Sequence, residues 1–225
     1  MKKLFTILCA AVLTLSVSAQ AQFGVVTGLN MSAIGSSATL ETGEEWVGST
    51  GIHLGGVAHF PLGDVIQLRT GAIYSQKGGK QTSLDGLYTI DMTINLDYLE
   101  MPIEVAFVMG EVFALSAGPY IAFAMNKSVA IETTDPDAVG WIAIGEAIMD
   151  DAIDNDVSGV DFGLNFGASF TIAESFLIGT KYSMGLTNIF NPAITSELYD
   201  PTETDDVWVN GCFSISFGYV FGGGY

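Results

Sequence analysis

Two histidines and a cluster of acidic residues are the side chains whose types could bind a metal ion. His53 and His59 fall on the same face of an alternating segment, but six residues of extended chain separate them by about 20 Å, so they cannot ligate one ion together. A single inward histidine is more often a hydrogen-bonded interior residue. The acidic cluster comprises Asp150, Asp151, Asp154, Asn155 and Asp156. Such oxygen ligands suit Ca²⁺, but their spacing does not match an EF-hand, so a solvated acidic loop is the better interpretation and we expect no metal and no cofactor.

Sequence motifs for covalent or phosphate chemistry are absent. There is no nucleophile elbow, no phosphate-cradling glycine pattern and no Cys/His pairing with ligand spacing. We therefore expect a non-enzymatic protein. Because loop and strand-end catalysts escape motif searches, an enzyme with catalytic residues on its loops remains an alternative.

The N-terminus has the features of an export signal. Basic residues at Lys2 and Lys3 precede an apolar stretch from Leu4 to Val17, and small residues ending at Ala21 suit cleavage before Gln22. We expect residues 1–21 to be a signal peptide and residues 22–225 to form one domain. Since Cys9 would leave with the signal, Cys212 would be the lone cysteine of the mature chain.

The composition combines acidity with high hydrophobicity. The chain carries 25 acidic and 7 basic residues, a net charge of −18, which argues against nucleic acid as a partner. Yet 49% of residues are hydrophobic and only 14% are charged. The acidic and apolar residues must therefore lie in different places.

A period of two residues, typical of half-buried β-strands, dominates the chain. The clearest cases are residues 161–170 and 212–221, where large apolar side chains alternate with small polar ones. The outward, lipid-facing set predicted from these two segments is Phe162, Leu164, Phe166, Phe170, Phe213, Ile215, Phe217, Tyr219 and Phe221. A soluble sandwich would cover its second face with charge, whereas this face is mostly Gly, Ser and Asn, so a membrane barrel is favoured over a soluble β-domain.

The pattern predicts an all-β fold, an eight-stranded antiparallel transmembrane β-barrel. The expected strands are residues 23–32, 50–60, 65–76, 94–109, 112–126, 159–170, 175–187 and 208–221. The connections alternate between short turns, expected in the periplasm, and long extracellular loops at residues 33–49, 77–93, 127–158 and 188–207. Most of the acidic residues fall in these long loops. Residues 139–148 are apolar enough for a short helix or a plug over the barrel mouth.

Several segments carry a family resemblance. They are Tyr74-Ser75-Gln76-Lys77-Gly78-Gly79, Tyr98-Leu99-Glu100-Met101-Pro102-Ile103, Ala117-Gly118-Pro119-Tyr120 and Lys181-Tyr182-Ser183-Met184-Gly185-Leu186-Thr187-Asn188-Ile189. Together they resemble the outer-membrane β-barrel (porin-like) family of Bacteroidetes, over essentially the whole mature chain. The resemblance implies location in the bacterial outer membrane and little about activity.

Strand parity also predicts which side chains fill the barrel. It directs Arg69, Glu100, Glu104, Asp161 and Lys181 inward, as a charge network joined by Tyr120 that plugs the lumen, since eight strands enclose just enough room for side chains. Asp161 alone has a competing interpretation, a position in water at the outer rim.

Pairing outward residues across each short turn predicts the register. It places Phe60 opposite Ile66, Val108 opposite Val112 and Phe170 opposite Phe176. By extension, the predicted inner pairs are Glu100 with Tyr120, Glu104 with Ser116 and Asn165 with Lys181.

The function expected from these features is a structural or surface-interaction role in the cell envelope, with acidic loops facing outward. The expected partners are outer-membrane lipid, the barrel-insertion machinery during biogenesis and an unidentified extracellular ligand. The alternatives are a small-solute porin-like channel and a loop-based outer-membrane enzyme.

Overall fold

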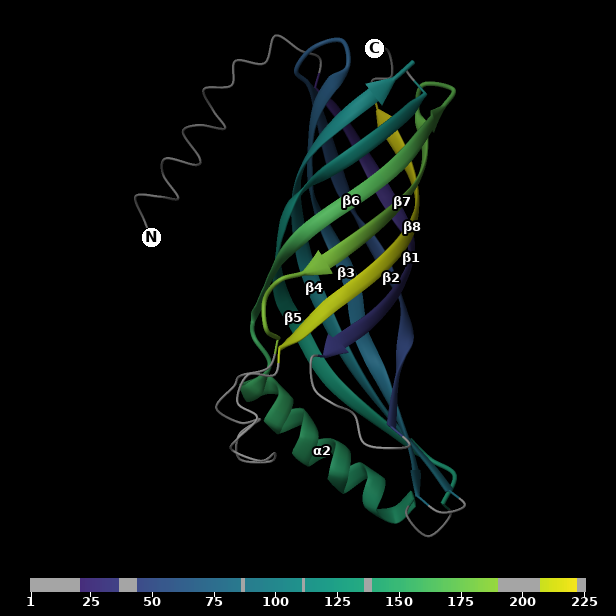
Figure 1. Cartoon of the computed structure of the whole chain (residues 1–225), viewed down its shortest axis with the longest axis vertical. Helices are drawn as coiled ribbons and strands as arrows, with labels where there is room; N and C mark the ends of the chain where they lie inside the picture. Colours follow the sequence, from purple (N-terminus) through teal and green to yellow (C-terminus); the bar gives the residue numbers. More distant parts are fainter. Residues whose placement is uncertain are drawn as a thin grey trace, which may run out of the picture.

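The computed structural model describes residues 21–36, 44–85, 88–110, 112–135, 139–189 and 207–221. Within these ranges the elements are β1 (Gln22–Ser36), β2 (Glu44–Pro61), β3 (Ile66–Asp85), β4 (Tyr88–Met109), β5 (Phe113–Thr133), α2 (Val139–Asp156), β6 (Val160–Ile172), β7 (Phe176–Gly185) and β8 (Trp208–Phe221). Each strand pairs antiparallel with the next and β8 pairs with β1, so the eight strands close into a barrel (Figure 1). Residues 1–20 of the expected signal peptide, residues 1–21, lie outside the described residues.

The strands β2 to β5 are longer than their sequence pattern predicts. Residues 77–93 are not a long loop, because β3 continues to Asp85 and β4 starts at Tyr88. Likewise, β2 starts at Glu44 and β5 ends at Thr133, inside the expected loops 33–49 and 127–158. Glycines and polar residues suggest a loop there, but strands that extend beyond a bilayer can pair without an apolar outer face.

The barrel has an apolar outer wall. On β6 and β8, Phe162, Phe166, Phe170, Phe213, Phe217, Tyr219 and Phe221 are exposed on this wall, and Leu164 and Ile215 lie on it partly exposed. Aromatic rings touch near the short turns, for example Phe113 and Phe170 with centroids 4.8 Å apart. This outer wall matches a lipid environment better than water.

The register differs from the predicted one by two residues at each short turn. Phe60 pairs with Leu68, Val108 with Ala114 and Phe170 with Ile178. Glu100 therefore lies opposite Ala122 rather than Tyr120, and Ser116 opposite Ala106 rather than Glu104. Lys181 lies opposite Gly167 rather than Asn165.

The cause of this difference is turn geometry. A shift of two residues leaves every side chain on its own face, so alternation alone cannot detect it. In the β6–β7 turn, Ala173 and Glu174 have φ of 49° and 60°, and Gly110 in the β4–β5 turn has φ of 61°. The centre of each of the three short turns lies one residue further along the chain than predicted, and two of these turns contain left-handed residues.

The helix α2 covers an unpaired strand edge. β6 pairs with β5 only as far as Phe123, so the outer part of β5 lacks a strand neighbour on that side within the described residues. There the backbone N–H groups of Val129 and Ile131 donate to Asp150 Oδ1 at 2.7 Å and Glu146 Oε1 at 2.8 Å. These acids lie four residues apart on one helix face. Figure 1 shows α2 beside the extended strand ends, beyond the barrel body.

The predicted helix at residues 139–148 is confirmed and continues to Asp156. The Asp150 carboxylate accepts a hydrogen bond from the backbone of the β5 edge. The side chains of the other members of the acidic cluster, Asp151, Asp154, Asn155 and Asp156, lie outside the described residues. Within the described residues, no helix is long and apolar enough to cross a bilayer.

The observed register predicts one crosslink and excludes another. In a Cys212→Ser background, the pair Ala106→Cys and Ser116→Cys should form a disulfide on oxidation, because facing Cα atoms in an antiparallel pair lie about 4.5–5.5 Å apart. The pair Ala106→Cys and Ala114→Cys would face each other in the register predicted from the sequence, which differs by two residues, and should not crosslink. Mass spectrometry of the oxidised proteins distinguishes them, and the reverse result would contradict this register.

The contact between α2 and β5 predicts local protection. Asp150→Ala should speed amide hydrogen exchange in residues 124–133 by about tenfold or more, because a hydrogen bond to a charged acceptor is lost. Asp150→Asn retains an acceptor oxygen and should change exchange less. Residues 99–107 of β4 provide the internal control. Equal exchange in all three proteins would show that the carboxylate does not protect the edge.

Candidate functional site in the barrel lumen

A buried trio of charges lies in the middle of the lumen. Glu100 of β4 forms an ion pair with Lys77 of β3, with 2.9 Å between Oε2 and Nζ, and accepts a hydrogen bond from Lys181 of β7 at 2.8 Å through Oε1. Glu100 and Lys77 are almost wholly buried, with side chains 2% and 1% exposed. Because an isolated buried charge is costly, each ammonium is stabilised here by the same carboxylate.

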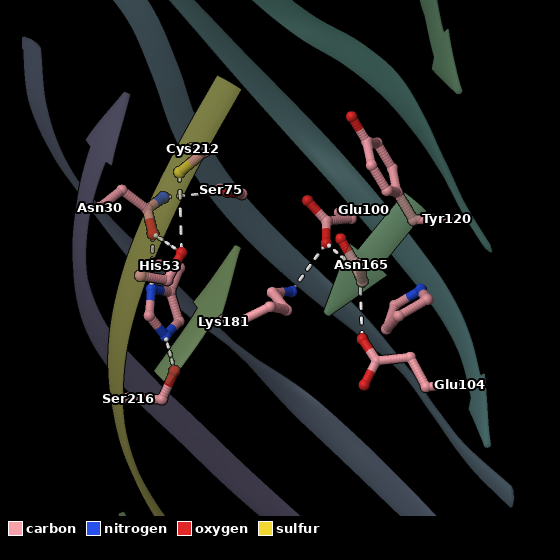
Figure 2. A network of polar contacts seen from close by, with 12 residues as sticks. Asn30, His53, Ser75, Glu100, Glu104, Tyr120, Asn165, Lys181, Cys212 and Ser216 are labelled. Atoms are coloured by element: carbon pink, nitrogen blue, oxygen red, sulfur yellow. Dashed lines mark hydrogen bonds and ion pairs between the residues drawn. The ribbon is translucent and has the colours of Figure 1, made fainter. Parts of the chain in front are cut away.

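Further polar groups extend this trio toward the short turns. Asn165 donates to Glu104 Oε1 at 3.0 Å and to Glu100 Oε1 at 3.3 Å, and so links the two acids (Figure 2). Ser116 donates to Glu104 Oε2 at 2.9 Å. Nearer the turns, Arg69 donates to Gln67 and to Ser169.

A second buried group occupies the outer half of the lumen. Asp161 is fully buried, and its Oδ2 accepts from the Tyr120 hydroxyl at 3.0 Å and from Asn210 Nδ2 at 3.1 Å. A position for Asp161 in water at the rim is therefore wrong. The Lys77 ammonium lies 4.4 Å from the centroid of the Tyr120 ring, a favourable cation–π distance, and connects the two groups.

An apolar cluster closes the outer end of the lumen. It comprises Ile34, Ile94, Leu96, Tyr98, Tyr120, Ala122, Val157 and Ile189, with Ile153 and Trp208 packed against it. We call this cluster the apolar cap. Ile153 at the end of α2 and Val157 just after it contribute, and both lie beyond residues 139–148, for which a helix or a plug was predicted.

A hydrogen-bonded chain runs along the inner face of the barrel wall, on the other side of the lumen. Asn30 Oδ1 lies 2.9 Å from His53 Nδ1, and His53 Nε2 lies 2.9 Å from Ser216 Oγ (Figure 2). Since the amide oxygen can only accept, Nδ1 donates to it, and Nε2 of the neutral ring accepts from Ser216. Both ring nitrogens are thus engaged.

This chain has the order of a nucleophile, base and orienting group. The cavity beside His53 and Ser216, however, measures about 110 Å³, well below the roughly 300–1,000 Å³ of pockets that enclose drug-sized ligands. The chain lies inside the barrel wall, where its hydrogen bonds join β1, β2 and β8. His59 is also buried, opposite Arg69.

The structure brings most of the sequence-predicted interior residues into contact. Glu100 and Lys181 touch directly, Glu104 joins them through Asn165, and Tyr120 joins Asp161. Arg69 lies in the next layer, bonded to uncharged partners among others.

Sequence reasoning missed Lys77, which it assigned to a loop. Extending the alternation of β3 by one step beyond Ser75 would have directed Lys77 inward. With Lys77 included, the described charges below the apolar cap are three cations (Arg69, Lys77, Lys181) and three acids (Glu100, Glu104, Asp161).

Comparison with known proteins gives one family and several distant structures. A family model described as an outer membrane protein beta-barrel domain matches residues 16–191. No curated protein matches the sequence.

Among solved structures, 28 chains match. Ail, the attachment invasion locus protein of Yersinia pestis, is 12% identical, with 90% of this chain and 99% of that chain covered and a TM-score of 0.43. Neisserial surface protein A is 10% identical, with 89% and 98% covered and a TM-score of 0.44. OprG from Pseudomonas aeruginosa is 11% identical, with 90% and 97% covered and a TM-score of 0.37.

Removing the central carboxylate should destabilise the barrel strongly. Glu100→Ala leaves two cations without their shared partner, and we expect a loss of about 3–5 kcal/mol in the free energy of unfolding. Glu132→Ala, at an exposed position of β5, should change it by less than about 0.5 kcal/mol. Urea-induced unfolding in detergent micelles, followed by tryptophan fluorescence, measures both.

A double variant separates charge from packing. Glu100→Ala combined with Lys77→Met removes one of the two stranded cations, so it should unfold less readily than Glu100→Ala alone. Strictly additive losses would mean that Glu100 acts by filling space and not by pairing.

Proposed function

Because the chain belongs to the outer membrane protein β-barrel domain family, we propose that it is a non-enzymatic outer-membrane protein with a closed lumen, in a structural or surface-interaction role. A barrel with a closed lumen would not transport solutes.

The observation that carries the proposal is the filled lumen. The trio of Lys77, Glu100 and Lys181 crosses the middle of the barrel, and the apolar cap closes the outer end above it. A solute would have to separate buried ion pairs and also pass the rings of Tyr98 and Tyr120, the two largest fully buried side chains among the described residues. Both barriers oppose conduction.

The outer wall supports the proposed position in the membrane. A transmembrane strand needs about 9–11 residues, and on β4 the outward residues from Leu99 to Met109 are uniformly apolar over that length. We propose that this band contacts outer-membrane lipid after insertion by the barrel-assembly machinery. Cleavage of the export signal before Gln22 fits this proposal, since β1 starts at Gln22.

The outer end of the molecule supports a role in surface interaction. Ile144, Ile148 and Met149 are exposed on α2, a helix that extends beyond the barrel body. Exposed apolar side chains on a projecting element are typical of contact surfaces. We propose that this end of the barrel meets the unidentified extracellular ligand.

Planar-bilayer recording tests the closed lumen. The purified wild-type protein should give no reproducible single-channel steps, while a porin in the same bilayers serves as the positive control. A Tyr98→Ala, Tyr120→Ala double variant removes the largest side chains of the cap and should give steps more often than the wild type. Steps of equal frequency in both proteins would reject the closed lumen and favour a small-solute channel.

A further inference from the structure

A second polar site lies on the outside of the barrel, away from the lumen. It is a pocket of about 230 Å³ bordered by β2, β3, β4 and β5. Lys77 is among its lining residues, and its outward polar side chains are Thr50, Gln76, Asn95, Asp97, Asn126 and Ser128. The neighbouring residues of β4, Leu96 and Tyr98, are buried inside. The alternation of β4 therefore directs Asn95 and Asp97 to the outer wall.

The pocket forms where the strand pairing is irregular. The β2–β3 ladder shifts between Gly48 and His53, and the β4–β5 ladder shifts at Asp97 and Tyr98. At the first break the Gln76 side chain accepts a hydrogen bond from the backbone of Ile52 at 3.2 Å. Gly78, at φ 144°, has no room for a side chain, because a Cβ would lie 1.9 Å from the Ile94 carbonyl oxygen. These irregularities hollow the wall.

The position of the pocket is at the outer limit of the apolar band. Gln76, Asp97 and Asn126 form one row across β3, β4 and β5. The next row toward the short turns is Tyr74, Leu99 and Phe123. A ligand in this pocket would thus have polar groups around the part that lies in the pocket. Its remaining part would meet the apolar outer wall on the side toward the membrane.

The pocket's charge and hydrogen-bonding groups define the ligand's chemistry. The Lys77 ammonium is held in the lumen by Glu100, and the Lys80 ammonium pairs with Asp91 at 2.7 Å, an ion pair that holds the pKa of the Asp91 carboxyl below its usual range. Among the described lining residues Asp97 is the one acid, and the lining Lys77 and the nearby Lys80 are paired with other carboxylates, so an anionic headgroup is disfavoured.

Three amides, two outward hydroxyls and a carboxylate line the pocket, and the Gln76 amide is already hydrogen-bonded to Ile52 and Tyr74. The other groups offer both donors and acceptors, which match hydroxyl groups. Asp97 Oδ2 accepts a hydrogen bond from Asn126 Nδ2 at 3.4 Å, and the Asp97 carboxylate also interacts with the Tyr74 hydroxyl. Among the described residues, the side chains of Asn95 and Ser128 have no hydrogen-bond partner. These groups remain available to a ligand.

We propose that this pocket binds a neutral sugar headgroup of a glycolipid in the outer leaflet. The volume is below that of pockets for drug-sized ligands, so it suits one sugar ring. The acyl chains would lie along the row of Tyr74, Leu99 and Phe123. This site requires that the barrel span the membrane but not that its lumen be closed, so a conducting barrel would leave the assignment untouched.

The test is lipid retention in nanodiscs that contain phosphatidylcholine and a diacyl glycolipid with one hexose and matched acyl chains. Native mass spectrometry of the released protein should show the glycolipid bound in preference to phosphatidylcholine. Asp97→Ala should weaken glycolipid binding about tenfold, as expected for one lost hydrogen bond to a charged group. Asp64→Ala, in the turn at the opposite end, should bind like the wild type.

Two further arms keep the result decisive. Ser128→Val fills the pocket without removing charge and should also weaken binding, and the heat-induced mobility shift on gels shows whether each variant folds. Equal retention in the wild type and in folded Asp97→Ala or Ser128→Val would overturn the site. Displacement of the glycolipid by the free hexose at equal concentration would overturn the lipid assignment in favour of a soluble sugar.

Discussion

In the core of a bilayer no water is available to the peptide groups, so every backbone N–H and C=O must find its partner within the protein. The β1–β8 ladder meets this constraint by removing the last free edge within the membrane. Closure then divides the side chains into two populations. The outward side chains contact lipid. The inward side chains fill a narrow lumen, where their charges must balance, and here three cations face three acids.

The fold was predictable because closure and lipid impose a strict period of two. Phe162 to Phe170 and Phe213 to Phe221 show it so clearly that both faces follow from the sequence. The register was not predictable from the same signal, since a slip of two residues exchanges equivalent positions. It depends on the backbone conformation of turn residues such as Ala173 and Glu174, which are not the residue types that favour left-handed φ.

The interior was predictable where the alternation was unbroken, as at Glu100 and Glu104. Lys77 was missed because Gly78 and Gly79 follow it and resemble a turn, although β3 continues through them. The hydrogen-bonded chain of Asn30, His53 and Ser216 joins residues of three strands and has no local motif. The apolar cap recruits Val157 and Ile189 from connecting segments, where no period applies.

The helix on the outer part of β5 also determines how neighbouring molecules meet. A bare strand edge is a template on which a segment of another chain can add by main-chain pairing, and crowded barrels would then fuse sheet to sheet. Glu146 and Asp150 occupy the donors that such an intruding strand would need. A neighbouring protein can therefore meet this edge only through side-chain contacts, which are reversible and selective. Each barrel remains a separate molecule in a crowded membrane.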